Sequence, residues 1–248
     1  MASGKVMEAT TAKRAVPWRL GDVLAVMGLA LVVGIVAISV AAAVVGSAAD
    51  GDTDIPRLTS GLAATIAFDV VLLGLAVAFS VGKYRCHLSD LGFRRPRWGS
   101  WWLPLTTVAA LWLVLGVYLG IVQAAGAEGL QPQSTLDDDI FDTPLVIGLA
   151  ATLALVAAPI AEETFFRGFL FAGLRYRWGL VMAALVSGLL FGLLHFDAGS
   201  IIPFSLIGIV LALAYTVSGS IWVTIASHFL FNLVSFLAAI AVSGGGGG

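Results

Sequence analysis

Long apolar stretches separated by short polar loops make up almost the whole chain. Seven stretches stand out, at about 20–46, 61–82, 101–123, 144–174, 179–196, 200–217 and 220–242. An α-helix needs about 20 apolar residues to cross the hydrocarbon core of a bilayer. Backbone polar groups cannot stay unpaired in lipid, so such segments must be helical. The pattern therefore predicts an all-α fold, a polytopic membrane helix bundle of about seven transmembrane helices.

The fourth apolar stretch, 144–174, is too long for one simple span and contains Pro159. Proline removes a backbone hydrogen-bond donor and clashes with the preceding turn, so we expect a kink near 155–159. This kink comes directly before Glu162. The next reversal of the chain is predicted near Tyr176–Gly179.

The polar pattern divides the chain into three parts. Residues 1–19 form a polar N-terminal segment, residues 20–242 form one membrane-embedded domain, and residues 243–248 form a flexible glycine-rich tail. No internal repeat and no separate soluble domain is apparent. Membrane lipids are therefore the expected surroundings of the domain.

The loops between the apolar stretches alternate in charge. The loops at 47–60 and 124–143 are acidic, whereas the loop at 83–98 and the turn at 175–177 are basic. Lys and Arg beside a span favour the cytoplasmic side. We therefore expect a multi-pass protein of the cell membrane with a cytoplasmic N-terminus, which leaves only Arg57 among the Lys and Arg residues on the outer side.

Composition agrees with a membrane protein and excludes several other classes. The mean hydropathy is +1.00, and 11% of the residues are charged, compared with about 25% in soluble domains. The net charge of −2 gives no indication of nucleic-acid binding. The single cysteine, Cys86, excludes an internal disulfide and a cysteine-based metal cluster.

A small set of ionisable and polar residues interrupts the apolar stretches and forms the candidate site. A charge inside a membrane is costly, so such groups are expected to pair, to face water or to do chemistry. Asp69 is interpreted as a structural hydrogen-bonding group without a functional role. The candidate site residues are Glu162, Glu163, Arg167, His195, His228 and Asn232.

Spacing predicts which of these residues meet. Glu162 and His195 lie at similar distances from the predicted turn, about 25 Å at 1.5 Å per residue, so they can meet across one helix interface. His228 and Asn232 are four residues apart and share a helix face, and Glu163 is likewise placed to pair with Arg167.

These residue types suit hydrolysis of an amide. A glutamate beside a histidine can take a proton from water, which predicts Glu162 and His195 as the activating pair. His228 and Asn232 can donate to the developing oxyanion. The set Glu162, Glu163, His195 and His228 could instead hold Zn²⁺, so the cofactor is left open between zinc and none. Purely structural pairing of the same groups also remains open.

Three motifs in this region resemble those of a known family. Glu162-Glu163-x-x-x-Arg167, Phe191-x-x-x-His195 and His228-x-x-x-Asn232 are similar to the motifs of the CPBP intramembrane endopeptidases. This family of CAAX protease and bacteriocin-processing enzymes, also called Abi, includes the type II CAAX prenyl endopeptidases. The resemblance implies a peptide or lipidated protein as substrate, water activation by Glu162 and His195, an oxyanion site at His228 and Asn232, and electrostatic stabilisation by Arg167.

Two other functions are compatible with the same polar residues. A transporter could use them as a proton or ion relay. A non-enzymatic membrane protein, such as a bacteriocin-immunity protein, would need them only for packing. Loss of function in a Glu162→Gln variant would argue against the last of these.

Overall fold

The structure is a computed structural model that describes residues 16–47, 54–97, 99–132, 140 and 143–245. All regular elements in these ranges are helical, as the apolar pattern predicts. The α-helices are α1 (Leu20–Ser47), α2 (Asp54–Val77), α3 (Leu103–Ala124), α4 (Pro144–Thr152), α5 (Ala158–Glu163), α6 (Ala172–Leu193), α7 (Ile201–Ser218) and α8 (Ile221–Gly245). Short 3-10 turns are η2 (Leu88–Leu91), η3 (Glu128–Leu130) and η7 (Ala198–Ser200).

Six helices within the described ranges are long and apolar enough to cross a membrane. One of them, the 50-residue stretch Pro144–Leu193, combines the predicted fourth and fifth spans. The backbone leaves helical geometry inside it at Gly179, with φ 78° and ψ −178°. Glycine tolerates this positive φ, and the bend lies where the sequence predicts a reversal. The prediction of an all-α polytopic bundle is confirmed.

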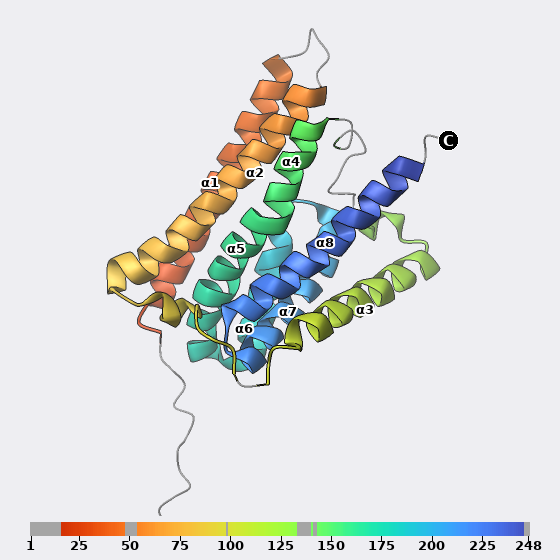
Figure 1. Cartoon of the computed structure of the whole chain (residues 1–248). Helices are drawn as coiled ribbons and strands as arrows, with labels where there is room; N and C mark the ends of the chain where they lie inside the picture. The colour runs from red at the N-terminus through yellow and green to blue at the C-terminus, as the bar shows by residue number, and fades with distance from the viewer. Residues whose placement is uncertain (1–15, 48–53, 98, 133–139, 141–142, 246–248) are drawn as a thin grey trace, which may run out of the picture.

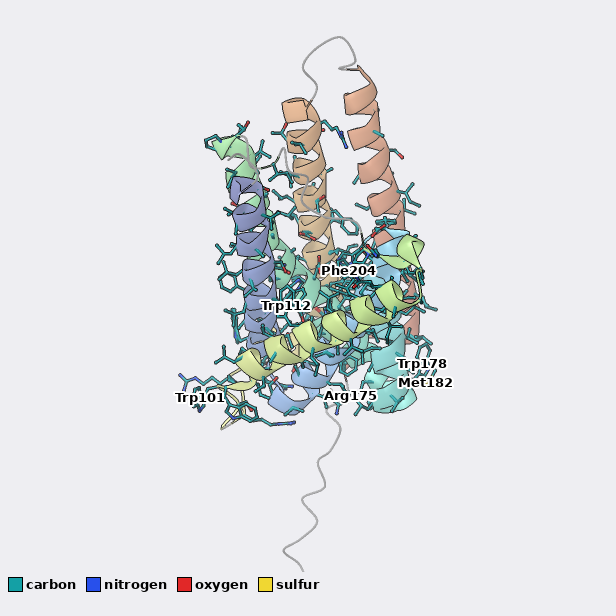
Figure 2. The ribbon with its side chains drawn as sticks, turned by 90° about the vertical axis from the view of Figure 1, so that its right-hand side faces the viewer. Trp101, Trp112, Arg175, Trp178, Met182 and Phe204 are labelled. Carbon is teal, nitrogen blue, oxygen red and sulfur yellow. The ribbon has the colours of Figure 1, made fainter. Side chains whose placement is uncertain are left out.

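The helices form a bundle in which α3 is set apart by its direction. In Figure 1, α1 and α2 run side by side, α4 and α5 continue beside them, and α8 lies next to α3. Figure 2 shows α3 crossing the bundle at a steep angle to α1, α2 and α8. The hairpin of α6 and α7 completes the bundle and packs against α3 through α7.

Small residues allow α6 and α7 to approach closely. A Cβ atom placed on Gly192 would lie 2.3 Å from the backbone oxygen of Ile201, and one on Gly208 would lie 2.8 Å from the Cα of Gly188. Glycine at helix contacts lets backbones come together and gain dispersion contacts in a membrane. This contact fixes α6 and α7 as one unit beneath the candidate site.

One end of the bundle carries most of the described basic residues, apart from Arg57 and Arg167, and is held together by hydrogen bonds. Figure 1 shows the start of α1, the end of α2 and the start of α8 at this end, and Trp101, Arg175 and Trp178 lie there in Figure 2. The backbone N–H of Ile221 donates to the Gly92 oxygen at 2.9 Å. Asp22 of α1 accepts from Lys83 and Tyr84. The cytoplasmic location of this end stays a prediction.

Among the described residues, three π-helical segments interrupt the long helices, and two of them flank the candidate site. They are η1 (Ala78–Gly82), η5 (Leu153–Ala157) and η6 (Thr164–Phe171). A π-helical segment, η5, lies where the kink near Pro159 is expected, and the kink itself stays a prediction. A π turn widens the helix and is frequent at functional sites, so the backbone on both sides of Glu162 departs from the regular helix that spacing arguments assume.

Candidate functional site

A buried ionic cluster around Glu163 forms the centre of the candidate site. Glu163 is the last residue of α5, and its Oε1 accepts hydrogen bonds from Arg167 Nη1 at 2.8 Å and from His228 Nδ1 at 3.1 Å. The side chains of Glu163 and Arg167 are both 0% exposed. The pair at positions i and i+4 is therefore present as its spacing predicts, and it additionally recruits a histidine from α8.

Arg167 connects this cluster to the α6–α7 hairpin. Its Nη2 donates to the backbone oxygen of Gly208 on α7 at 3.2 Å. Its guanidinium carbon lies 4.6 Å from the ring centroid of Phe191 on α6, within the range of a cation–π contact. A buried guanidinium needs such partners, because an isolated charge is poorly tolerated away from water. Arg167 thus fixes η6 against both helices of the hairpin.

Phe191 brings the second and third motifs to the same place. Its ring lies 4.9 Å from that of His195 and 6.2 Å from that of His228. Phe191 is fully packed, with 2% of its surface exposed. The sequence analysis assigned this aromatic residue no role, although it opens the second motif. It is the shared neighbour of Arg167, His195 and His228.

The orientation of His195 follows from its place at the end of α6. Its Nδ1 lies 2.7 Å from the backbone oxygen of Phe191, one of the carbonyls that the last turn of a helix leaves without an N–H partner. A carbonyl can only accept, so Nδ1 carries the hydrogen and Nε2 of the neutral ring keeps its lone pair. The ring also packs 4.3 Å from that of Phe204 on α7, which Figure 2 marks.

Spacing predicts that Glu162 meets His195, and this meeting stays a prediction. No direct hydrogen bond joins the two side chains in the described residues, and Nδ1 of His195 is bound to its own helix. The Oε2 atom of Glu162 is buried without a hydrogen-bond partner. Its electrostatic neighbours are Asp69 of α2, Glu163 and Arg167. Asp69, which the sequence analysis left without a role, therefore belongs to the surroundings of Glu162.

Asn232 satisfies a carbonyl that Pro159 leaves free. In η5 the backbone N–H of Ala158 donates to the oxygen of Leu153, five residues earlier. In the same five-residue register, the residue at position 159 would donate its N–H to the oxygen of Ala154, but Pro159 has no N–H. The side-chain Nδ2 of Asn232 donates to this oxygen instead, at 2.8 Å. One N–H of the amide is thereby used for structure, and the other N–H and the amide oxygen are left for further contacts.

The proposed zinc ligands do not gather into a metal site. Across the described ranges, no group of three or more His, Cys, Asp and Glu side chains lies close enough to hold a metal ion. The set of Glu162, Glu163, His195 and His228, which the sequence analysis named as the ligands if zinc is bound, is therefore not assembled as one group of ligands. The physical reason is that Glu163 is engaged by Arg167 and His228, while Glu162 interacts with a different helix. We derive no chemical step through a metal.

The remaining arrangement offers proton acceptors on one side and hydrogen-bond donors on the other. The acceptors are the unpaired carboxyl oxygen of Glu162 and the Nε2 lone pair of His195. The donors are the amide of Asn232 and, when the ring carries a proton on both nitrogens, Nε2 of His228, whose Nδ1 is held by Glu163. Such a combination can take a proton from water and stabilise a developing negative charge.

Comparison with known proteins gives the following matches. Residues 144–234, which include all three motifs, match the family model described as type II CAAX prenyl endopeptidase Rce1-like. The chain is 26% identical over 132 residues to "Putative membrane peptidase YdiL" of Bacillus subtilis, covering 50% of this chain and 54% of that protein. It is 34% identical over 93 residues to an uncharacterized protein of Mycoplasma capricolum, covering 36% of this chain and 27% of that protein. The chain thus spans about half the length of the first relative and less of the second, and no solved structure matches it significantly.

Proposed function

Since residues 144–234 match the Rce1-like type II CAAX prenyl endopeptidases, as the three motifs predicted, we propose that this chain is an intramembrane endopeptidase. The observation that best supports this proposal is the convergence of the motifs. Glu163 and Arg167 of the first motif, Phe191 and His195 of the second, and His228 of the third are joined by hydrogen bonds and ring contacts. The function would be hydrolysis of a peptide bond in a membrane-associated protein.

In the proposed reaction, Glu162 and His195 activate the water. The carboxylate of Glu162 accepts a proton from the water, and Nε2 of His195 accepts a hydrogen bond from it. The hydroxide that forms adds to the carbonyl carbon of the scissile peptide bond. His195 can act in this way because its Nδ1 is occupied by the Phe191 carbonyl, which leaves Nε2 as the acceptor.

The oxyanion formed by this attack would be stabilised by His228 and Asn232. Asn232 keeps one N–H after donating the other to Ala154. Nε2 of His228 can donate when the ring carries a second proton, because Nδ1 donates to Glu163. Glu163 and Arg167 would act on the reaction by holding this ring and by supplying a fixed local field. Donors fixed in advance in a poorly solvated site are effective, because they need no reorganisation during the reaction.

Two variants test the roles of the activating pair. Purified protein in liposomes is given a fluorogenic peptide, prenylated or unprenylated, and cleavage is followed for Glu162→Gln and His195→Ala. Loss of a general base costs about 10²–10⁴-fold in rate, so both variants should be strongly impaired. Ser39→Ala is the control, since Ser39 lies on the exposed surface of α1. Full cleavage by both site variants would contradict the proposal, and proton flux without cleavage would favour the relay.

The same assay distinguishes the two possible forms of the mechanism. Elemental analysis of the purified protein and cleavage in the presence of a chelator decide between a metal-dependent and a glutamate-only reaction. Comparing prenylated with unprenylated peptides decides whether the enzyme requires a lipid on its substrate. A preference for the prenylated peptide would indicate that this chain acts on lipidated proteins, as the name of the matched family model implies.

A further inference from the structure

A buried aspartate lies on α2, outside the segment that matches the family model. Asp69, Leu72 and Ala76 are all buried and recur at intervals of three or four residues, so they lie on the face of α2 that packs into the bundle. Ser80, in η1 directly after α2, is buried as well. Only 2% of the Asp69 surface is exposed. A carboxyl group in this position must have a compensating partner or a function.

The Oδ2 atom of Asp69 has no hydrogen-bond partner within the described part of the chain. The same holds for Oε2 of Glu162, and the two carboxyl groups interact electrostatically. Their helices are in contact, because α2 packs directly against α5 and η6. Two buried oxygens from neighbouring helices are therefore unpaired near each other.

The two other charged groups beside this pair, Glu163 and Arg167, hydrogen-bond mainly to each other and to further partners, although Glu163 Oε2 and Arg167 Nε also lack a hydrogen-bond partner among the described residues. Glu163 is bound by Arg167 and by His228, which is the titratable residue that α8 brings to this region. Arg167 acts on Glu162 from η6, but its hydrogen bonds go to Glu163 and to a backbone oxygen on α7. The neighbouring helices add little more: α1 contributes Asp22, which is bound to Lys83 at the basic end, and α4 and η5 contain no ionisable residue. On α2 itself, Arg57 lies three turns away.

Two carboxylates cannot both stay ionised at low cost in such a place. Like charges at one site repel, and one of the two groups then retains its proton. An unpaired buried acceptor is also costly. A single proton held between the groups, directly or through a bridging water, reduces both costs, because it removes one charge and supplies a donor. The two groups would then titrate as a pair.

We propose that Asp69 and Glu162 form a carboxyl pair that holds one proton, and that Asp69 is a positioning residue for Glu162. The proposal rests on the function proposed above and assigns a role to a helix outside the matched segment. During the reaction, an O–H bond of the water breaks and its proton moves to the pair. The hydroxide bonds to the peptide carbon. The pair becomes uncharged at this step, a form that a poorly solvated site favours.

Asp69→Asn tests the pair through the dependence of cleavage on pH. The amide keeps the size of the side chain but cannot share the proton, so the singly charged, active form of the site loses the hydrogen bond that stabilises it. The acidic limb of the pH–rate profile, which reports loss of the first proton from the pair, should then move to higher pH by about one unit or more, the minimum for strongly interacting groups. Ser80→Ala is the matched control, because Ser80 is buried in η1, directly after α2, and its hydroxyl donates to the backbone oxygen of Ala76. An unchanged profile in a folded, active Asp69→Asn variant would overturn the proposal.

Infrared difference spectroscopy tests the same proton without any catalysis. Wild-type protein at neutral pH should give a carbonyl band from a protonated carboxyl group. The band should disappear in Asp69→Asn and in Glu162→Gln and persist in Ser80→Ala. Absence of the band in wild-type protein, or its persistence in both site variants, would reject the pair. If the band behaves as expected but no peptide is cleaved, the proposed enzymatic function fails and the carboxyl pair stands.

Discussion

Replacement of Arg167 by methionine is the most direct test of the cluster that supports the site. Arg167 is fully buried, donates to Glu163 and to a backbone oxygen on α7, and lies against an aromatic ring. Methionine has similar length and restores part of the packing. It leaves the Glu163 carboxylate hydrogen-bonded to His228 but with no permanent positive charge beside it.

The expected decrease in the free energy of unfolding comes from that uncompensated charge on Glu163. Removing one partner of a buried ion pair costs about 3–5 kcal/mol. At about 2–4 °C per kcal/mol for a chain of this size, the melting temperature should fall by roughly 6–20 °C. The double variant Glu163→Met/Arg167→Met should be destabilised by much less than the sum of the destabilisations of the two single variants, because neither charge is then left without a partner.

Thermal unfolding of the purified protein in detergent measures all three variants. Arg95→Met is the control, since Arg95 is exposed, and its melting temperature should stay within the range of a surface substitution. If Arg167→Met melts like wild type, or if the double variant loses the full sum, the Glu163–Arg167 pair does not hold the cluster together. Either result would refute the reasoning.

Three further predictions concern packing, the basic end and the π-helical turn. Gly192→Ala should destabilise the α6–α7 hairpin by about 1–3 kcal/mol in thermal unfolding, because its Cβ would meet a carbonyl of α7; Gly120→Ala, which has open space around it, should not, and equal effects would contradict this packing. Burial raises the pKa of the Cys86 thiol, so a membrane-impermeant maleimide should label it slowly near neutral pH and faster as pH rises. Labelling should occur from the cytoplasmic side only. Labelling of Cys86 in intact cells would contradict the predicted orientation of the chain in the membrane. Asn232→Leu should cost about 1–3 kcal/mol by leaving a buried carbonyl unpaired, and Pro159→Ala, which restores a backbone donor there, should reduce that cost.

Much of the fold could be predicted because lipid leaves few alternatives to helices. The long apolar stretches indicated the spans, and the bend at Gly179 falls in the predicted turn region. The pairing of Glu163 with Arg167 followed from a local spacing that the structure retains. Predictions of this kind succeed because they depend on neighbouring residues or on composition over a whole span.

The contacts between helices were harder to predict. The placement of Glu162 beside His195 stays a prediction, because it assumes a regular rotation per residue, whereas η5 and η6 turn the helix by less per residue on either side of Glu162. The capture of His195 by the Phe191 carbonyl depends on where α6 ends. Asp69 gave no sequence signal for its partner, because a buried carboxyl group can be satisfied by any neighbouring helix. A hydrogen-bond inventory that included the missing N–H of Pro159 could have suggested a side-chain donor such as Asn232.

The hydrogen bonds at the basic end bear on how this protein could be divided or recombined. The backbone N–H of Arg97 donates to Ser218, and Arg94 both donates to Gly219 and accepts from Ser220. The chain between α2 and α3 therefore clasps the link between α7 and α8. A fragment that contains only the motif-bearing helices would lose these hydrogen bonds. A chimaera built from two relatives would need to take the α2–α3 loop and the α7–α8 link from the same parent.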